Sequence, residues 1–561
     1  MKLPDKYNEI DLENLLKSIP CHQLGNVLDT YVDVMGKEDF CKLVSEQLVH
    51  FVHLEDAIPQ NLSHYALFIR DAIKIFLTRI SYHRLRELIV KQSILDSTHN
   101  SSPERLLNLA LHFPTLHKLG QIIARRPELD PLVKNWLTRL ESGLFGTEGQ
   151  KNIAIVSKQI ADINSEFQIN IQPKVLAEAS VATIVPFTWK NINGTKKISG
   201  VFKVLKPKIK EKLHAELEIL EYVANYFDDH LDRYGLKELQ LTKLFNEIRE
   251  HLAREVDLAA EQEALAHAAS VYNSYDRVRV PKLAPFCTET LTAMEHIKGE
   301  KITEIAATAK QKTALARQTF ETIICRPLFW PGDRALFHGD PHAGNIIAVP
   351  DKNSDGFEIA LIDWTLAGFL SKKQRSHIME LMLGILSSNI RAIISAIKKL
   401  SVNSEEELFH THSVLEEQIK TLLVSLPYQS YDHLKKTFKL LEEMTLSGVV
   451  FSSDLMLFRK AFFTLEGVLN DLSPNFALHK TMESYLSSLL IQEMPVRVIN
   501  SFAPTMDKVE NYRSLLTNQD LYYLYLQNCM TAWSLQSLQY NDWIEALGKL
   551  AIDFANMSNE D

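Results

Sequence analysis

The chain has 561 residues, of which 46% are hydrophobic and 23% are charged, and its formal net charge is −9 at pH 7. This length accommodates several domains or one two-lobed catalytic unit with extensions, and the composition is that of an ordinary globular protein. The negative charge gives no support to nucleic-acid binding, which depends on neutralising phosphates with lysine and arginine, so we expect no nucleic-acid partner.

Glycine and cysteine usage narrow the class further. Only 19 residues are glycine, about half the usual frequency, which favours a helix-rich chain with few tight turns. The five cysteines are scattered and never spaced as Cys-x-x-Cys. Neither a zinc site nor a disulfide framework is therefore indicated, and a reducing compartment is favoured.

No segment has the pattern of a signal peptide or of a membrane-spanning helix. The first residues carry charges where a signal peptide needs an apolar run. The most apolar stretch, Leu381 to Ile397, is interrupted by Arg391, and we interpret it as a buried helix. We expect a cytoplasmic protein, with peripheral contact to the inner face of a membrane left open.

The first part of the chain is predicted to be helical. Apolar residues recur at helical spacing, as in Leu12, Leu15, Leu16 and Ile19, which predicts a helical bundle or a docking surface for a protein partner. A second helical region follows as far as about residue 172 and contains Lys118-Leu119-Gly120-Gln121.

The sequence pattern then changes to one rich in β-branched residues. The runs Val181–Phe187 and Ile198–Leu205, separated by Asn191–Gly194, predict two strands joined by a turn. A long amphipathic helical pattern covers about 208–272, and short strand candidates follow at Val278–Pro281 and Glu289–His296.

From Ile302 onward helices dominate, interrupted only at Ala335–Val349 and Phe357–Leu366. The whole pattern predicts five segments: an N-terminal helical extension at 1–95, a second helical region at 96–175, a small β-containing lobe at 176–300, a helical lobe at 301–480 and a helical tail at 481–561. The order of these segments is that of a helix-rich α+β protein.

The strongest chemical signal is the segment Phe337–Asn345, which contains a proline and two glycines and is therefore predicted to be a loop. An Asp and an Asn five positions apart, Asp340 and Asn345, match the kinase catalytic loop, in which the Asp contacts the acceptor and the Asn ligates Mg²⁺. The apolar run that ends in Asp363 offers a second oxygen ligand of the kind Mg²⁺ prefers.

Two other interpretations of this loop are weighed against phosphate chemistry. Either aspartate alone is often a turn or cap residue, but the two in this order and context favour function. A metal site made by His338, Asp340 and His342 would need a strand, which the intervening proline and glycine do not form.

Upstream, Lys203 lies between apolar neighbours in a predicted strand. A lone strand lysine is usually an exposed residue, yet its place after a strand–turn–strand and before a long helix fits the lysine that holds nucleotide phosphates. Its carboxylate partner is sought in the segment 254–261. On a helix Asp257 and Glu261 share a face, whereas Glu255 points elsewhere.

Together these segments resemble the UbiB (AarF/ADCK) family of atypical kinases over roughly residues 105–480. The matching segments are Lys118–Gln121 with the family's KxGQ motif, Ala177–Ser180 with its alanine-rich replacement for the Gly-rich loop, Val201–Lys203 with its VAVK-like strand, Glu255–Asp257 with Glu261 for its ExD region, Met294–Gly299 with its adenine-lining segment, and Thr464–Val468 with a late helix. KxGQ is the most discriminating of them, because small-molecule phosphotransferases share the HGDxHxxN…IDW pattern and lack it.

The resemblance implies a two-lobed protein-kinase-like fold that uses ATP or ADP with Mg²⁺. It implies that Lys203 pairs with Glu261 in catalysis, that Asp340 is the catalytic-loop carboxylate, and that Asn345 and Asp363 bind the metal. It further implies nucleotide contacts by Ala177, Ala179, Ser180, Lys203, Glu295 and Ile297, and gating by Lys118, Gln121, Glu255 and Asp257. Since the family's KxGQ helix covers the peptide site of other kinases, the expected activity is ATP hydrolysis or phosphotransfer to a small molecule or lipid, in lipid and coenzyme Q homeostasis.

Some features depart from the family pattern. Asp363 is followed by Trp364 and Thr365 rather than by Phe and Gly, and Thr365 cannot adopt glycine-only conformations, which disfavours a switching activation segment. The tail at 521–554 is amphipathic rather than membrane-spanning, and we favour helix packing over membrane contact for its tyrosines. A nucleotide-sensing pseudokinase with a helical partner-binding extension, and an antibiotic- or choline-type phosphotransferase, remain as alternatives.

Overall fold

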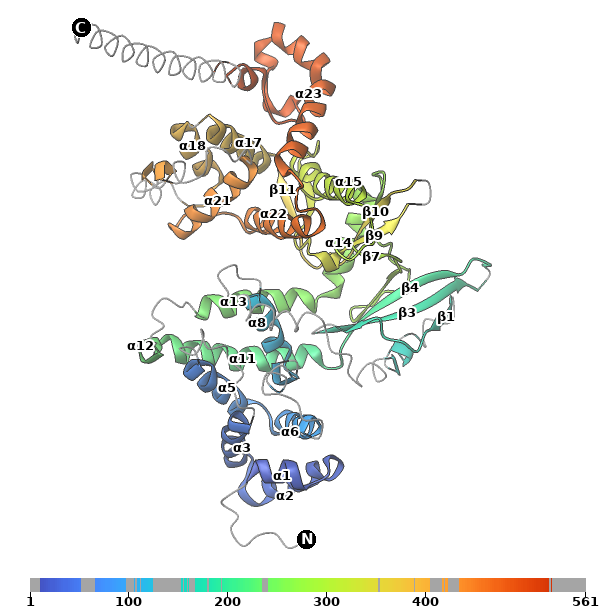
Figure 1. The fold of residues 1–561 in the computed structure, drawn as a ribbon, viewed down its shortest axis with the longest axis vertical. Helices are drawn as coiled ribbons and strands as arrows, with labels where there is room; N and C mark the ends of the chain where they lie inside the picture. Colours follow the sequence, from blue (N-terminus) through green and yellow to red (C-terminus); the bar gives the residue numbers. More distant parts are fainter. Residues whose placement is uncertain are drawn as a thin grey trace, which may run out of the picture. The chain divides into compact units, whose positions relative to one another are not determined.

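The computed structural model describes residues 11–51, 66–96, 105, 108–110, 112–124, 153–154, 156–158, 160, 167–178, 181–192, 194–234, 241–351, 354–387, 389–403, 416–417, 419–421, 433–523 and 526. The chain forms two compact units (Figure 1). Unit 1 comprises residues 1–263 and 282–296, and unit 2 comprises residues 264–281 and 297–561. The division into five segments remains a prediction.

Unit 1 begins with helices that share one hydrophobic core. They are α1 Leu12–Ser18, α2 Cys21–Met35, α3 Lys37–Phe51, α5 Ala66–Arg79, α6 Tyr82–Asp96 and α8 Pro114–Ala124. Their apolar faces pack with Leu220, Val223 and Phe227 of α11, which spans Ile209–Asp228. The helical prediction for the N-terminal extension is confirmed for its described residues, and the extension packs on α11 rather than standing apart as a separate bundle.

The sheet of unit 1 has the strand order β1-β3-β4-β6, with β2 paired to β3. Its strands are β1 Phe167–Ile171, β2 Ala177–Glu178, β3 Ala182–Asn191, β4 Ile198–Leu205 and β6 Leu291–Glu295. β3 and β4 form the predicted antiparallel pair around the 191–197 turn, and stacked Phe187 and Phe202 lie in the core beneath them. The predicted strand–turn–strand is therefore confirmed.

Unit 2 contains two small sheets and a larger helical part. The first sheet has the order β5-β10-β9-β7 and the second pairs β11 with β8. The strands are β5 Val278–Arg279, β7 Glu300–Lys301, β8 Arg334–His338, β9 Ile346–Pro350, β10 Phe357–Leu361 and β11 Ala367–Ser371. The helices are α15 Ala309–Phe320, α16 Arg326–Leu328, α17 Lys372–Leu386, α18 Ile390–Leu400, α21 His433–Leu446, α22 Ser453–Leu472 and α23 Leu478–Phe502. A π-helical turn, Glu321–Cys325, joins α15 to α16.

The helix-rich α+β prediction is confirmed, but four local predictions were wrong. The region expected to be helical as far as 172 contains β1, where alternate residues are more buried, as a strand requires. The pattern at 208–272 is divided into α11, α12 Leu231–Tyr234, α13 Leu241–Glu255 and α14 Leu258–Tyr272. The stretch expected to be one helix at 381–397 is two helices, because Asn389 caps the start of α18. Strand β11 was missed.

Within the described residues, no helix is both long enough and apolar enough to cross a membrane.

Candidate functional site

In unit 2, β8 delivers the chain into the predicted catalytic loop, and the pairing of β9 with β10 brings the loop beside Asp363. In that antiparallel pair Ile346 lies opposite Leu361. Ile362, the residue that follows β10, donates its backbone N–H to Asn345 O at 3.0 Å. The two predicted magnesium ligands, Asn345 and Asp363, are therefore carried by two segments that are hydrogen-bonded directly to each other.

Gly339 is required where the loop passes close to its neighbours. Its backbone N–H donates to Leu366 O at 2.7 Å, and a Cβ built at this position would lie 2.7 Å from the same oxygen and 2.8 Å from a Leu457 methyl. Such distances are well below van der Waals contact, so a side chain here would displace the loop.

His338 is fully buried and holds the base of the loop. Its Nδ1 accepts from the Asp340 backbone N–H at 3.2 Å, so in the neutral ring Nε2 carries the proton and donates to Ile362 O at 3.0 Å. Burial lowers the pKa of His338, while its hydrogen bond to Ile362 and the carboxylates of Asp340 and Asp363 oppose that shift. Both ring nitrogens thus form hydrogen bonds to the backbone, one within the loop and one to Ile362, which argues against His338 as a metal ligand.

The side chain of Asn345 is oriented by the loop itself. It is almost fully buried, and its Nδ2 donates to the backbone carbonyl of Asp340 at 3.1 Å. That carbonyl also accepts from His342 N at 2.9 Å. Because Nδ2 is committed to a carbonyl, the amide oxygen Oδ1 is the atom that Asn345 presents as a ligand.

Asp363 adopts an unusual backbone conformation, with φ at +58°, which is sterically unfavourable for most residues with a side chain. Thr365 holds it there, because its hydroxyl donates to Asp363 Oδ1 at 2.6 Å and its backbone N–H donates to the same oxygen at 3.2 Å. The sequence identified Thr365 only as a departure from glycine. Its contact with Asp363 had no signal in the sequence.

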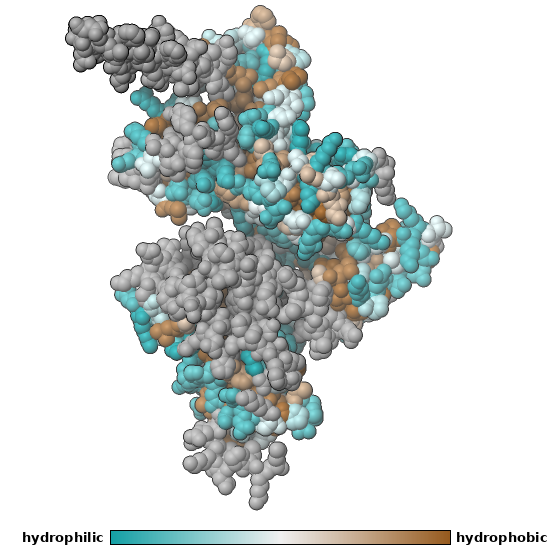
Figure 2. All heavy atoms as spheres, in the orientation of Figure 1, coloured by the Kyte–Doolittle hydropathy of each residue, from teal (hydrophilic) through white to brown (hydrophobic). Residues whose placement is uncertain are grey.

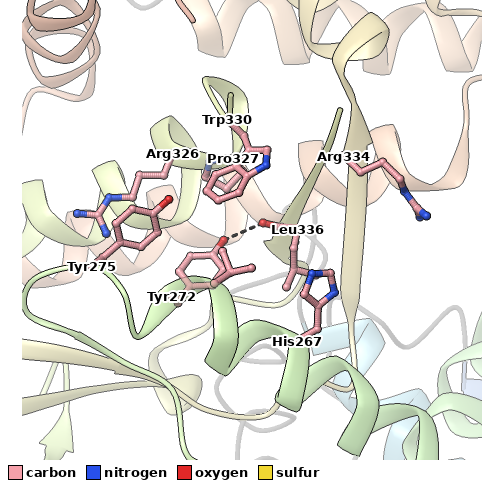
Figure 3. A pocket seen from close by; sticks show the side chains of 9 residues that line it. His267, Tyr272, Tyr275, Arg326, Pro327, Trp330, Arg334 and Leu336 are labelled. Carbon is pink, nitrogen blue, oxygen red and sulfur yellow. Dashed lines mark hydrogen bonds between the residues drawn. The ribbon is translucent and has the colours of Figure 1, made fainter. Parts of the chain in front are cut away.

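Trp364 fills an apolar pocket next to the loop. It is fully buried, its ring centroid lies 4.8 Å from that of His338 and 5.3 Å from that of Tyr272, and its indole N–H donates to Leu361 O at 3.2 Å. Tyr272 in turn donates its hydroxyl to Leu336 O of β8 at 2.9 Å (Figure 3). Burial raises the pKa of Tyr272, so this hydroxyl stays a donor at any physiological pH.

A cavity of about 40 Å³ lies on the other side of Tyr272, among aromatic side chains (Figure 3). Tyr275 and Trp330 line it, and the Arg326 guanidinium lies over the Tyr275 ring at 4.0 Å. A volume of this size holds a few water molecules and is much too small for a nucleotide.

In unit 1, Lys203 and Glu261 form a buried ion pair. Lys203 lies in the middle of β4, between Ile184 of β3 and Thr292 of β6. Its Nζ is 2.7 and 2.8 Å from the two carboxylate oxygens of Glu261, whose side chain is 2% exposed. The carboxylate partner of Lys203 is therefore Glu261, as the family resemblance implied.

Asp257 has a different role from the one its spacing suggested. It lies before α14 rather than within a helix, and its side chain accepts from Ala260 N at 3.1 Å, as an N-cap does. Asp257 and Glu261 therefore do not share a helical face. The cap also explains why the predicted long helix is interrupted after Glu255.

Lys118 of α8 forms an ion pair with Glu255 at the end of α13. The start of α8 is fixed by the fully buried Glu216 of α11, which accepts from Thr115 N at 3.0 Å and Thr115 Oγ1 at 2.6 Å and pairs with Arg84 at 2.5 Å. Two of the predicted gating residues are thus in contact. The side chain of Gln121 lies outside the described residues.

The predicted nucleotide-contacting residues are distributed over several elements. Ala177 is exposed in β2, opposite Ile184, and Ala179 and Ser180 lie outside the described residues. Glu295 ends β6 opposite Gly200, and the chain passes from unit 1 to unit 2 before Ile297. β1 and β2 precede β3 in the chain, and both pair with it. The alanine-rich segment therefore begins with β2 and follows β1, so it does not precede the first strand of the sheet.

The oxygen donors of unit 2 fit Mg²⁺ better than they fit a transition metal. The described residues contain no group of three or more His, Cys, Asp or Glu side chains that could hold a metal ion by themselves. An amide oxygen from Asn345 and a carboxylate from Asp363 form the small protein contribution that Mg²⁺ uses when nucleotide phosphates and water complete its shell.

Comparison with known proteins agrees with these features. The ABC1 atypical kinase-like domain matches residues 147–397. The probable protein kinase UbiB of Haemophilus ducreyi is 24% identical over 423 residues, which are 72% of this chain and 75% of that protein. The probable protein kinase UbiB of Shewanella loihica is 26% identical over 397 residues, 68% of each chain. Among solved structures, the complex of Rv3197 with erythromycin from Mycobacterium tuberculosis covers 70% of this chain and 97% of its own, at 16% identity and a TM-score of 0.39.

The chain therefore contains an atypical kinase-like domain in a helix-rich α+β fold. The match and these relatives support the resemblance to the UbiB (AarF/ADCK) family of atypical kinases that the sequence motifs predicted.

Proposed function

We propose that the chain is a Mg²⁺-dependent nucleotide phosphotransferase or ATPase that acts on a small molecule, a lipid-related compound or water rather than on a protein. The observation that carries the proposal is the hydrogen-bonded arrangement of the 338–345 loop and the 362–365 segment, in which Asn345 and Asp363 are oriented by their own neighbours. Such preorganised oxygen ligands suit phosphoryl transfer, where catalysis is mostly positioning and charge stabilisation.

In this proposal each residue has a defined task. Asn345 Oδ1 and the Asp363 carboxylate hold Mg²⁺, which when bound neutralises charge on the nucleotide phosphates. Asp340 faces the attacking hydroxyl or water and orients it, and Lys203, held by Glu261, contacts the phosphates. The ion pair with Glu261 holds the lysine side chain in one conformation, with its Nζ 2.7 and 2.8 Å from the two carboxylate oxygens.

The preference against protein substrates is proposed on the basis of α8. Glu216 fixes the start of this helix, and Lys118 ties it to α13 through Glu255. In this family the KxGQ helix covers the place where other kinases bind a peptide, and a helix held at two points is suited to that role.

The test is nucleotide binding and Mg²⁺-dependent nucleotide hydrolysis by the full chain, for wild type and for Asp340→Asn, Asn345→Leu and Asp363→Asn. A matched control is Asp471→Asn, because Asp471 is exposed near the end of α22. Wild type and the control should bind a fluorescent ATP analogue and hydrolyse ATP equally. Asp340→Asn should bind the analogue and lose turnover, whereas Asp363→Asn should lose the Mg²⁺ dependence of binding.

Two other outcomes would decide against the proposal. If wild type binds nucleotide and all the variants match its background turnover, the chain is a nucleotide-sensing pseudokinase. If neither ATP nor ADP binds with or without Mg²⁺, nucleotide chemistry itself is wrong for this protein.

A further inference from the structure

The walls of the cavity beside Tyr272 carry hydrogen-bond donors that have no acceptor among the described residues (Figure 3). Arg326 lines the cavity, and its Nη1 is buried without a hydrogen-bond partner. The side chains of Tyr275 and Trp330 also line it, and neither the hydroxyl nor the indole N–H is hydrogen-bonded to a described residue. Because arginine and tryptophan side chains can only donate, what this cavity lacks is an acceptor.

The walls also carry positive charge that is not neutralised. Arg326 and Arg334 line the cavity and lie on opposite sides of it in Figure 3, and neither forms an ion pair with a described carboxylate. Among the described residues that line the cavity there is no Asp or Glu. The acidic residues next to this site in the chain, Asp276 and Asp333, are exposed. A half-buried guanidinium without a counter-charge favours an anion over a neutral ligand.

The tyrosines keep their protons and therefore do not repel an anion. Burial raises the pKa of Tyr275, although the positive charges of Arg326 and Arg513 oppose that shift. The Tyr275 hydroxyl is thus neutral near pH 7 and is free of any charge that would compete with a bound anion. The hydroxyl of Tyr272 is neutral as well, and it is already engaged with Leu336 O.

The volume of the cavity limits the ligand to a small molecule. The cavity measures about 40 Å³, and one water molecule needs roughly 10–15 Å³ of such space. There is therefore room for roughly three or four groups the size of a water molecule. Acetate and bicarbonate are planar oxyanions of about this size, whereas tetrahedral phosphate and sulfate are larger.

We propose that this cavity is a binding site for a small planar oxyanion, a carboxylate or bicarbonate, held by Arg326 and the Trp330 indole N–H. Hydrogen bonds from a charged donor to an oxyanion are among the strongest in proteins, and the indole N–H supplies a neutral donor. Water in the cavity would also accept hydrogen bonds, but it would leave Arg326 without a counter-charge. An oxyanion supplies the acceptors and the charge together.

The position of the site in unit 2 agrees with a built binding site. Arg326 directly follows the π-helical turn Glu321–Cys325, and such irregular turns are frequent at functional sites. Leu336 of β8 forms part of the wall, and His338 ends the same strand, so a bound anion would restrain β8. In the view of Figure 2, the surface over α15 is mostly hydrophilic, which suits entry of a small charged solute from water (Figure 2).

The experiment measures the thermal unfolding temperature of the full chain against the concentration of acetate, bicarbonate or phosphate, with chloride holding the ionic strength constant. A ligand that binds the folded chain raises this temperature in proportion to its occupancy. Acetate, bicarbonate or both should raise it with a dissociation constant of roughly millimolar size, because so small a ligand gains limited binding energy. Phosphate should have a smaller effect. No nucleotide is present, so the result does not depend on the proposed phosphotransferase function.

Two variants and a control assign the effect to this cavity. Arg326→Gln should need roughly 10- to 100-fold more anion for the same shift, since it removes a charged donor. Trp330→Phe keeps an aromatic ring and removes only the N–H, so it should need roughly 2- to 10-fold more. Arg391→Gln is the matched control, because Arg391 is exposed on α18 and forms no ion pair with a described carboxylate. It should respond as wild type does.

The unfolding transition of each variant without anion shows whether it is folded, and hydrogen exchange of the wild-type backbone locates the site. The bound anion should slow exchange in β8 and in the segment 326–330, and it should not do so in Arg326→Gln. The proposal is overturned if neither planar anion stabilises wild type, or if phosphate stabilises it as strongly as they do. It is also overturned if folded Arg326→Gln and Trp330→Phe both respond as wild type does, because the anion would then bind elsewhere.

Discussion

Replacing Thr365 by valine tests whether the threonine hydroxyl prepares Asp363 for the proposed binding of Mg²⁺. Valine has nearly the shape of threonine, so the change removes the 2.6 Å hydrogen bond from Oγ1 to Asp363 Oδ1 and leaves the 3.2 Å bond from the backbone N–H. A hydrogen bond to a charged group contributes about 1.5–3 kcal/mol, which corresponds to roughly a 10- to 100-fold change in an equilibrium constant. Groups that orient a metal ligand usually have effects of about this size.

We therefore expect Thr365→Val to raise the Mg²⁺ concentration needed for half-maximal nucleotide binding roughly 10- to 100-fold. Binding of a fluorescent ATP analogue, titrated with Mg²⁺, measures this without depending on turnover. Thr365→Ser keeps the hydroxyl and should behave as wild type. Thr365→Gly restores the residue of the Asp-Phe-Gly motif but lacks the hydroxyl, so it should resemble the valine variant.

The reasoning is refuted if Thr365→Val has the Mg²⁺ requirement of wild type while Asp363→Asn raises it. In that case Asp363 binds the metal and its left-handed conformation, with φ at +58°, is maintained without the threonine hydroxyl. If Asp363→Asn also has no effect, the error lies in the proposed metal site and not in the role of Thr365.

Three further predictions follow from contacts in unit 1. Glu261→Gln should lower the free energy of unfolding in urea by about 3–5 kcal/mol, because it removes the buried carboxylate from a close ion pair. Lys203→Met combined with Glu261→Leu should regain most of that stability but not the turnover. Lys118→Glu and Glu255→Lys should each alter turnover in the same direction, and the turnover of the charge-swapped double variant should move back towards that of wild type. If both single variants have the turnover of wild type, the pair does not gate the site. Burial lowers the pKa of His112 to about 3, so the free energy of unfolding should fall as pH drops below about 6.5. This residue should account for a loss of about 1 kcal/mol between pH 6.5 and 5.5. In urea unfolding over the same interval, the free energy of unfolding of His112→Gln should therefore fall by about 1 kcal/mol less than that of wild type.

The sign of the pH effect follows from which state binds more protons. In the unfolded chain His112 titrates near its ordinary pKa of about 6.5, whereas in the folded chain it stays neutral to a much lower pH. The unfolded state therefore binds the extra proton first, and acid favours unfolding. A variant with the same acid sensitivity as wild type would show that His112 is not buried in the way the structure indicates.

Local patterns were enough to predict the elements on which the site is built. The β-branched runs around Asn191–Gly194 predicted β3 and β4, and the proline and glycines of the 337–345 segment predicted a loop. These features succeed because they depend on neighbours in sequence: backbone restriction by proline, turn-forming glycine and β-branched side chains in extended chain.

The predictions from sequence were wrong where a helical pattern is interrupted by a single capping residue or by a strand in a polar stretch. Asp257 is a good helix residue by spacing alone, and only its contact with Ala260 N reveals that a new helix starts there. β1 alternates partly buried Phe167 and Ile171 with polar neighbours over five residues, which is too short a pattern to separate from a helical one.

By itself, the sequence predicted the resemblance to the UbiB family, the helix-rich α+β class and the residues proposed for a phosphate site, because these predictions rest on motif order and local pattern. The resemblance implied that Lys203 pairs with Glu261, and the structure shows that contact. Only the tertiary structure decided that Thr365 holds Asp363 and that α23 turns its charged residues inward. Each of these depends on which side of an element faces which neighbour. That is set by packing between segments far apart in the chain, and spacing along a single helix or loop does not contain it.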